Sequence, residues 1–206
     1  MLPIYYLTLD DLEDDETGMF LISLVDNPAM QVQAVKLKDE PQLVTLKATD
    51  EKKQYLTSAV IIPEKPIYRN TQDEEYYIKF SVEDVEKIRN KFFQKTGNLS
   101  LSNKNHDAAD TVDAQLIESW IIENATMDKA VALGFTDLPK GTLMATYKIM
   151  DKVFWDNEIM SGNITGFSLE GNFNFTPVKL KNQSEPEEKS EFDKLVELID
   201  SLAQHE

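Results

Sequence analysis

The sequence predicts an α+β protein that is dominated by β-strands. Short apolar runs rich in β-branched and aromatic residues recur along the chain, and clusters of Gly, Pro, Asn and Asp separate them. Only two segments, near the middle of the chain and at its C-terminal end, carry helical periodicity over several turns. With 41% hydrophobic residues among 206, the chain can bury a substantial core.

The first half of the chain reads as strands followed by one helix. The runs "IYYLTL" and "MFLISLV" predict two strands of a hairpin-like entry, and a further β-rich run ends at Pro63. Ser81, with Asp84 three residues later, resembles a helix N-cap, and apolar residues at helical spacing follow it. Gly97 suits the end of that helix.

The second half continues the sheet. We expect His106 on a loop, followed by the acidic loop "DAADTVD" and the apolar strand "LIESWII". The run "TLMATYKI" predicts another strand, and residues 151–161 predict a short helix that Gly162 stops. A last strand carries Ser168 within "GFSLEGNF".

The composition changes near residue 180, which divides the chain into a domain at 1–180 and a tail at 181–206. The tail predicts a charged linker and then an amphipathic helix, because its apolar residues form one stripe. Such a helix either recruits a partner or docks on its own domain, and both interpretations stay open.

Charge and cysteine content exclude several functions. The chain has 37 acidic and 21 basic residues, a formal charge of −16 that disfavours binding to nucleic acid and to anionic membranes. Without cysteine there is no disulfide, thiolate nucleophile or cysteine zinc site. Neither a signal peptide nor an apolar run of about 18 residues is evident, so we expect a soluble, intracellular protein.

Histidine is scarce in the chain, and its positions limit the possible chemistry. The chain has only His106 and His205, and His205 lies beside the C-terminus, where chains usually fray. Any histidine-dependent chemistry must therefore use His106. Two histidines so far apart also make a metal site built on imidazole improbable, and we expect no metal and no cofactor.

The sequence also offers a serine and two carboxylates that could act together with His106. On a strand, Ser168 shares a face with Glu170, while Glu118 stands among large apolar residues and needs a partner if buried. Combined with His106, either carboxylate would complete a serine-nucleophile site. Taken one by one, such residues are more often a surface-loop histidine, an ordinary strand serine, and carboxylates that are solvated or paired.

Seven ordered segments resemble the prohead proteases of tailed bacteriophages, in the branch found in defective-prophage-like elements. The segments are "LISLVDNPAM", "YLTSAVIIPEKPIYRN", "EEYYIKFSVEDVEKI", "NHD", "LIESWII", "VFWDNEIMSG" and "GFSLEG". Proteins of this family process scaffold and capsid proteins during procapsid maturation. The family is distantly similar to the herpesvirus assemblins, which implies a β-barrel flanked by helices.

The resemblance implies a serine endopeptidase with Ser168 as nucleophile and His106 as general base, within hydrogen-bond reach of each other. Assemblins use a second histidine, which this chain lacks, so the third role falls to an acid: Glu118 first, Glu170 second and Asp107 third. The implied substrates are phage scaffold and major capsid proteins, and the chain itself. The implied location is the procapsid in the host bacterial cytoplasm, with a homo-oligomer such as a dimer as the assembly.

Two other functions compete with this interpretation. A catalytically inactive capsid-assembly or scaffold protein could keep the same fold, because a fold alone does not determine activity. A small-molecule hydrolase is less well supported, since "GFSLEG" lacks the G-x-S-x-G nucleophile elbow.

Overall fold

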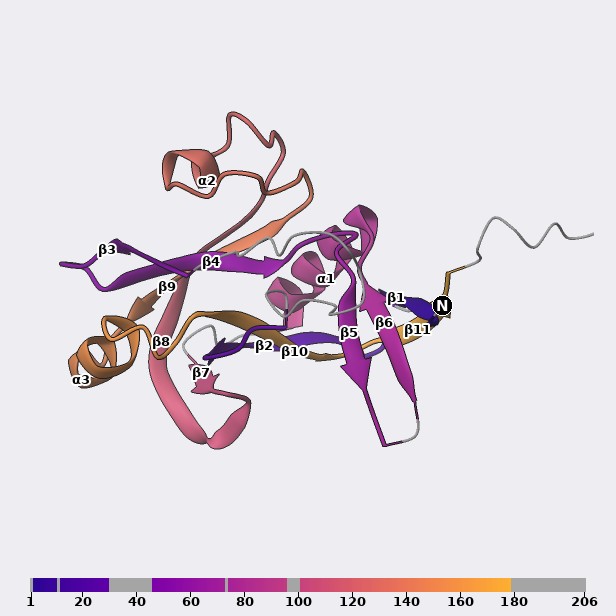
Figure 1. Cartoon of the computed structure of the whole chain (residues 1–206), viewed down its shortest axis with the longest axis horizontal. Coiled ribbons are helices and arrows are strands. Elements are labelled where there is room, and N and C mark those ends of the chain that lie inside the picture. The colour runs from indigo at the N-terminus through magenta and orange to yellow at the C-terminus, as the bar shows by residue number, and fades with distance from the viewer. Residues whose placement is uncertain (1, 11, 30–45, 73, 96–100, 179–206) are drawn as a thin grey trace, which may run out of the picture.

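A computed structural model describes residues 2–10, 12–29, 46–72, 74–95 and 101–178, and its strands form two sheets (Figure 1). The larger sheet contains, in spatial order, β10 (Gly166–Asn172), β2 (Gly18–Val25), β7 (Leu101–Lys104), β8 (Asp107–Ile121), β9 (Leu143–Ile149), β4 (Tyr55–Ile61) and β3 (Lys47–Asp50). The smaller sheet contains β11 (Asn174–Pro177), β1 (Ile4–Thr8), β6 (Glu75–Lys79) and β5 (Ile67–Asn70).

Few helices accompany these sheets. They are α1 (Val82–Lys95), α2 (Lys129–Ala132), α3 (Lys152–Phe154) and a π-helical turn, η1 (Trp155–Ile159). The predicted β-dominated α+β class is confirmed. No helix among the described residues is both long enough and apolar enough to cross a bilayer.

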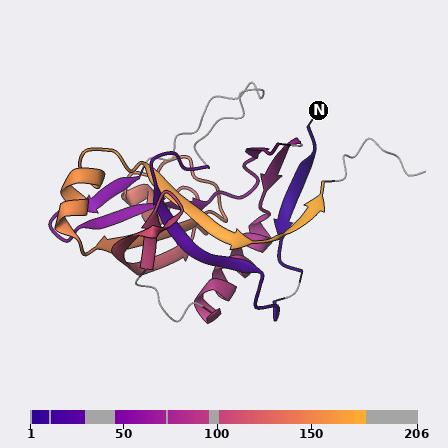
Figure 2. The same ribbon diagram turned by 90° about the horizontal axis from the view of Figure 1, so that it is seen from below.

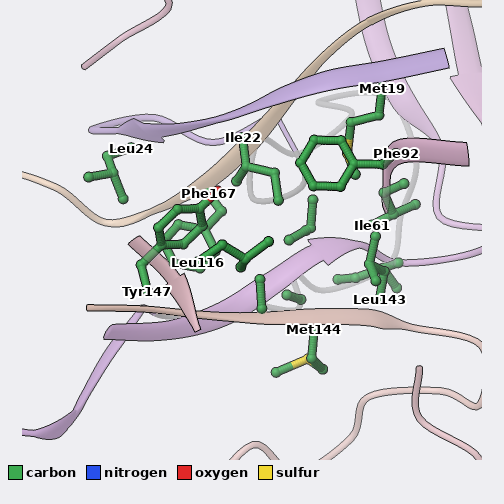
Figure 3. Close-up of a cluster of buried hydrophobic side chains, with 14 of the residues drawn as sticks. Met19, Ile22, Leu24, Ile61, Phe92, Leu116, Leu143, Met144, Tyr147 and Phe167 are labelled. Atoms are coloured by element: carbon green, nitrogen blue, oxygen red, sulfur yellow. The ribbon is translucent and has the colours of Figure 1, made fainter. Parts of the chain in front are cut away.

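The larger sheet curls into a half-barrel. Its edge strand β10 comes into contact with β4 from the far side of the same sheet, and α1 packs against β2 and β9. Figure 3 shows apolar side chains from β2, β4, β8, β9, β10 and α1 meeting inside this curl. The ring of Phe167 meets the ring of Tyr147 edge to face, with centroids 5.5 Å apart. Because Phe167 points into the core, its neighbour Ser168 points to the opposite face of the strand.

A continuous segment, formed by β10 and then β11, links the two sheets. β10 pairs with β2 in the larger sheet, and β11 follows almost at once and pairs with β1 in the smaller sheet (Figure 2). The register of β10 shifts between Glu170 and Gly171. A Cβ on Gly171 would lie 2.4 Å from the carbonyl oxygen of Gly18, so only glycine fits this close approach.

Local predictions succeeded more often than predictions of strand pairing. The helix begins at Val82, after Ser81 accepts a hydrogen bond from the amide of Asp84 at 3.0 Å. The predicted hairpin-like entry is wrong, because β1 and β2 lie in different sheets. The predicted acidic loop at 107–113 is also wrong: it forms the start of β8, where the acidic residues lie on the exposed side. The predicted tail helix lies outside the described residues.

Candidate active site

His106 is held by a tight turn between two paired strands. β7 and β8 form an antiparallel hairpin in which Lys104 pairs with Asp107, so its loop contains only Asn105 and His106. Both loop residues have positive φ angles, 52° and 61°, as a type I′ turn requires. Glycine usually occupies the second of these positions, and a histidine there bears roughly 1 kcal/mol of backbone strain. Such a strained residue at a solvent-accessible position is a candidate for function.

The imidazole of His106 contacts the carboxylate of Glu170. Its Nδ1 lies 3.1 Å from Oε1 of Glu170, which reaches it from β10. The same oxygen accepts a hydrogen bond from Asn103 Nδ2 at 2.8 Å and a short one from the hydroxyl of Ser23. The Glu170 carboxylate, which β10 carries, is therefore contacted by side chains from β2, β7 and the β7–β8 turn.

These contacts determine which nitrogen of the imidazole can act as a base. The Ser23 hydroxyl lies 3.3 Å from Nδ1, but its single proton is already donated to Glu170. Nδ1 must then carry a proton itself to be bound favourably by the carboxylate and by Ser23. The unprotonated nitrogen is Nε2, for which no hydrogen-bond partner is found among the described residues. The His106 side chain is 44% exposed, so this nitrogen can meet an incoming group.

The environment of Glu170 favours its charged form. Partial burial raises the pKa of this carboxyl, but hydrogen bonds from Ser23, Asn103 and His106 outweigh burial, and the pKa lies below its usual value. Glu170 is therefore a carboxylate at neutral pH. A negative charge beside Nδ1 orients the ring and stabilises the imidazolium that forms when Nε2 takes a proton.

Ser168 lies on the same strand face as this cluster. It is paired directly with Ser23 across β10 and β2, and it stands two residues before Glu170. Ser23 is fully buried, whereas Ser168 is half-buried. No hydrogen bond joins Ser168 to His106 within the described part of the chain, where the hydroxyl that contacts the imidazole is that of Ser23.

The other two predicted acids point elsewhere. Glu118 forms a short ion pair with Lys129, and no contact between Glu118 and His106 is found among the described residues. A register shift between Leu116 and Glu118 also breaks the alternation on which its predicted position depended. Asp107 accepts a hydrogen bond from the amide of Ala109 at 2.8 Å. In the described ranges, no group of three acidic or histidine side chains is arranged to hold a metal ion.

Sequence reasoning missed Ser23 and Asn103. Ser23 is a hydroxyl inside the apolar run of β2, and a buried polar group in such a run needs a partner. A single hydroxyl among apolar residues was therefore the sequence signal for Ser23. No sequence signal indicated Asn103, because its contact with Glu170 depends on the strand pairing that brings β7 beside β2.

A cavity of about 340 Å³ adjoins the strand of Ser168. It opens between the two sheets, and both Ser168 and the inward-facing Phe167 line it. Its other walls come from β1, β4, β5, β6 and β11. A hydroxyl, an imidazole and a carboxylate beside an apolar pocket are the groups that serine hydrolases use, although here Ser168 and His106 share no hydrogen bond among the described residues.

Comparison with known proteins narrows this class. A family model described as "Putative phage serine protease XkdF" matches residues 40–176, which include His106, Ser168 and Glu170. The chain belongs to this family of phage serine proteases. No curated protein and no solved structure gives a significant match.

We expect Glu118→Gln to leave catalysis within about twofold of the unchanged protein. The Glu118 and Lys129 side chains are 40% and 49% exposed, and an exposed ion pair contributes about 0.2–1 kcal/mol to stability. Steady-state cleavage rates and urea unfolding would measure both effects. A loss of activity of a hundredfold or more, without unfolding, would restore Glu118 as the third catalytic residue.

Proposed function

We propose that this chain is a serine endopeptidase in which Ser168 is the nucleophile, His106 the general base and Glu170 the acid that orients the imidazole. The observation that carries the proposal is the contact between Glu170 and Nδ1 of His106. It leaves Nε2 as the basic atom, and Ser168 lies on the same strand face two residues from Glu170. Glu170 thus replaces Glu118 in the third role.

The reaction proceeds in two acyl transfers. Nε2 of His106 takes the proton of Ser168 as Oγ attacks the carbonyl carbon of the substrate, and the imidazolium then protonates the leaving amine. Water attacks the resulting ester and gives its proton to Nε2, and the imidazolium then returns that proton to Oγ of Ser168 as the acid product leaves. The proposal includes a closer approach of Ser168 to His106 when substrate binds. Hydrogen bonds between catalytic residues are often long in the free enzyme and shorten in the complex.

Ser23 is a weaker candidate for the nucleophile, although it contacts the imidazole. Its hydroxyl is fully buried and its proton is donated to Glu170, so a substrate carbonyl has no access to it. It also faces Nδ1, the nitrogen that carries a proton. Ser23 and Asn103 act instead as positioning residues that hold the Glu170 carboxylate towards His106.

The match to a family of phage serine proteases supports a proteolytic role in a phage. We propose that the substrates are scaffold and capsid proteins, cleaved inside the procapsid in the host cytoplasm, and that the barrel is related to that of the assemblins. The competing function is an inactive assembly protein with the protease fold. The absence of a Ser168–His106 hydrogen bond among the described residues is the observation that favours this alternative.

Labelling with a fluorophosphonate probe would test the proposal. An activated serine attacks phosphorus and forms a stable adduct, so we expect mass spectrometry to find the adduct on Ser168. Ser23→Ala should keep the adduct on Ser168, at a lower rate, and His106→Ala should abolish it. The full chain should be labelled both alone and co-expressed with its scaffold and capsid proteins. Absence of any adduct in both settings would favour the inactive assembly protein.

A further inference from the structure

The turn that carries His106 is attached to the end of β2 through the side chain of Asn105. The strand pairing before the turn is short: β2 and β7 run parallel, and Leu24 is paired with Lys104. One residue later, the backbone amide of Asn105 donates a hydrogen bond to the carbonyl oxygen of Leu24 at 3.0 Å. Oδ1 of Asn105 then accepts a hydrogen bond from the backbone amide of Asp26, also at 3.0 Å. The Asn105 side chain therefore prolongs the contact between the turn and β2.

Asn105 uses its side chain where a regular strand would use its backbone. If the parallel ladder continued, the amide of Asp26 would pair with the backbone carbonyl of Asn105. Asn105 has a positive φ of 52°, so its backbone has left the extended conformation, and its side-chain oxygen accepts that hydrogen bond instead. Asparagine tolerates this backbone conformation and has a short side chain that hydrogen-bonds nearby backbone groups. The choice of residue thus serves both the turn and its attachment to β2.

Asp26 connects this turn with the strand of the proposed nucleophile. Its backbone carbonyl oxygen accepts a hydrogen bond from the hydroxyl of Thr165 at 2.6 Å. Thr165 directly precedes β10, the strand that carries Ser168. The carboxylate of Asp26 also accepts a hydrogen bond from Nδ2 of Asn105 at 3.4 Å. Asn105, Asp26 and Thr165 therefore form a bracket between the turn of His106 and the start of β10.

We propose that Asn105 is a positioning residue, which acts through the bracket to fix the backbone of the His106 turn relative to β10. The contact with Glu170 orients the imidazole ring, but the ring is carried by an exposed turn of only two residues. The base and the nucleophile lie on separate elements, and a displacement of about 1 Å between such groups can lower a rate about a hundredfold. This inference rests on the proposed peptidase function for the reaction that the bracket serves.

Asn105→Gly in the full-length protein would test the proposal. Glycine adopts the positive φ freely, so the turn is retained and only the side-chain bonds to Asp26 are lost. We expect the maximal rate of fluorophosphonate labelling at Ser168 to fall about tenfold or more, with the half-saturating probe concentration within about twofold of normal. Urea unfolding should be nearly unchanged. A merely structural role would instead lower stability and leave the labelling rate of the folded protein unchanged.

An exchange of the two side-chain types provides a rescue and a second test if Asn105→Gly fails to fold. Asn105→Asp brings a second carboxylate beside that of Asp26, and their repulsion should lower the labelling rate about fivefold. Adding Asp26→Asn restores a donor opposite an acceptor, so the double variant should label within about twofold of the normal rate. Asn124→Gly is the matched control, because it removes an exposed asparagine that accepts a hydrogen bond from the amide of Thr126 outside the bracket. This control should label at the normal rate.

Nitrogen NMR of the histidine rings separates this inference from the peptidase proposal. The chain has two histidines, so nitrogen-15 labelling of histidine gives two sets of ring signals, and His106→Gly identifies the set of His106. At alkaline pH the ratio of the Nδ1–H to the Nε2–H tautomer should fall about fivefold in Asn105→Gly and stay unchanged in Asn124→Gly.

These outcomes distinguish the two proposals. If the protein labels no serine but the tautomer ratio depends on Asn105, the peptidase proposal fails and the bracket stands. The bracket is overturned if Asn105→Gly changes neither the labelling rate nor the tautomer ratio, or if the double variant labels no faster than Asn105→Asp.

Discussion

Replacing His106 by glycine is expected to abolish peptide-bond hydrolysis without weakening the fold. Without an imidazole the Ser168 hydroxyl keeps its proton, and loss of the base in a well-studied serine protease lowers kcat by about 10⁶. Glycine adopts the positive φ of 61° at this turn position freely, which relieves roughly 1 kcal/mol of strain. Removal of the contact with Glu170 offsets part of this gain, so stability should stay level or rise slightly.

Comparison with His106→Ala separates the catalytic effect from the structural one. Alanine also removes the imidazole but retains the backbone strain, so both variants should be equally inactive, while the glycine variant should be about 1 kcal/mol more stable in urea unfolding. The rate of fluorophosphonate labelling and the cleavage of co-expressed scaffold protein would measure activity. Residual activity within tenfold of normal in either variant contradicts the role of His106 as base.

Glu170→Gln is expected to lower kcat by about 10³–10⁴ with little change in KM. The amide is nearly the same size as the carboxylate but carries no charge, so it cannot stabilise the imidazolium, and its NH₂ group can favour the wrong tautomer of His106. Single-turnover kinetics on a cleaved peptide would measure the effect. Glu118→Gln is the matched control, since it removes a carboxylate from the same sheet. Equal rates in the two variants would exclude a special role for Glu170.

The same substitution has a consequence for stability that depends on pH. Because the pKa of Glu170 in the folded protein is lowered, its charge stabilises the fold above the unfolded-state pKa of about 4.3. That contribution falls as the pH drops through the lowered folded-state pKa. The stability difference between the unchanged protein and Glu170→Gln should therefore be largest near neutral pH and shrink under acidic conditions. Urea unfolding at several pH values would measure it, and a difference that grows towards acid would contradict the assignment.

The sequence predicted elements whose signals are local. The helix at Val82–Lys95 follows from its cap and its apolar spacing, and β4, β9 and β10 follow from their β-rich runs. The π-helical turn after Phe154 was not predicted, because its defining hydrogen bond, from the amide of Met160 to the carbonyl of Trp155, leaves no residue pattern.

Predictions that depended on strand pairing were less successful. The partners of β1 are β6 and β11, and one partner of β2 is β10, all distant in the chain, so nothing near residue 20 indicates the pairing. For the same reason the sequence interpretation ranked Glu118 ahead of Glu170, whereas the structure brings Glu170 into contact with His106. That difference depends on a register shift in β8 and on a two-residue turn that brings His106 beside β10.

The pairing of β2 with β10 also determines the stage of chain synthesis at which the site can form. Ser23 contacts Glu170, which lies 147 residues further along the chain. A nascent chain that has emerged from the ribosome only as far as Gly162 contains His106, Asn103 and Ser23 but lacks both the proposed nucleophile and its carboxylate. Contacts of such long sequence separation form late in folding, since closing the intervening loop costs entropy first. The proposed catalytic centre is therefore incomplete until nearly all of the half-barrel has been synthesised.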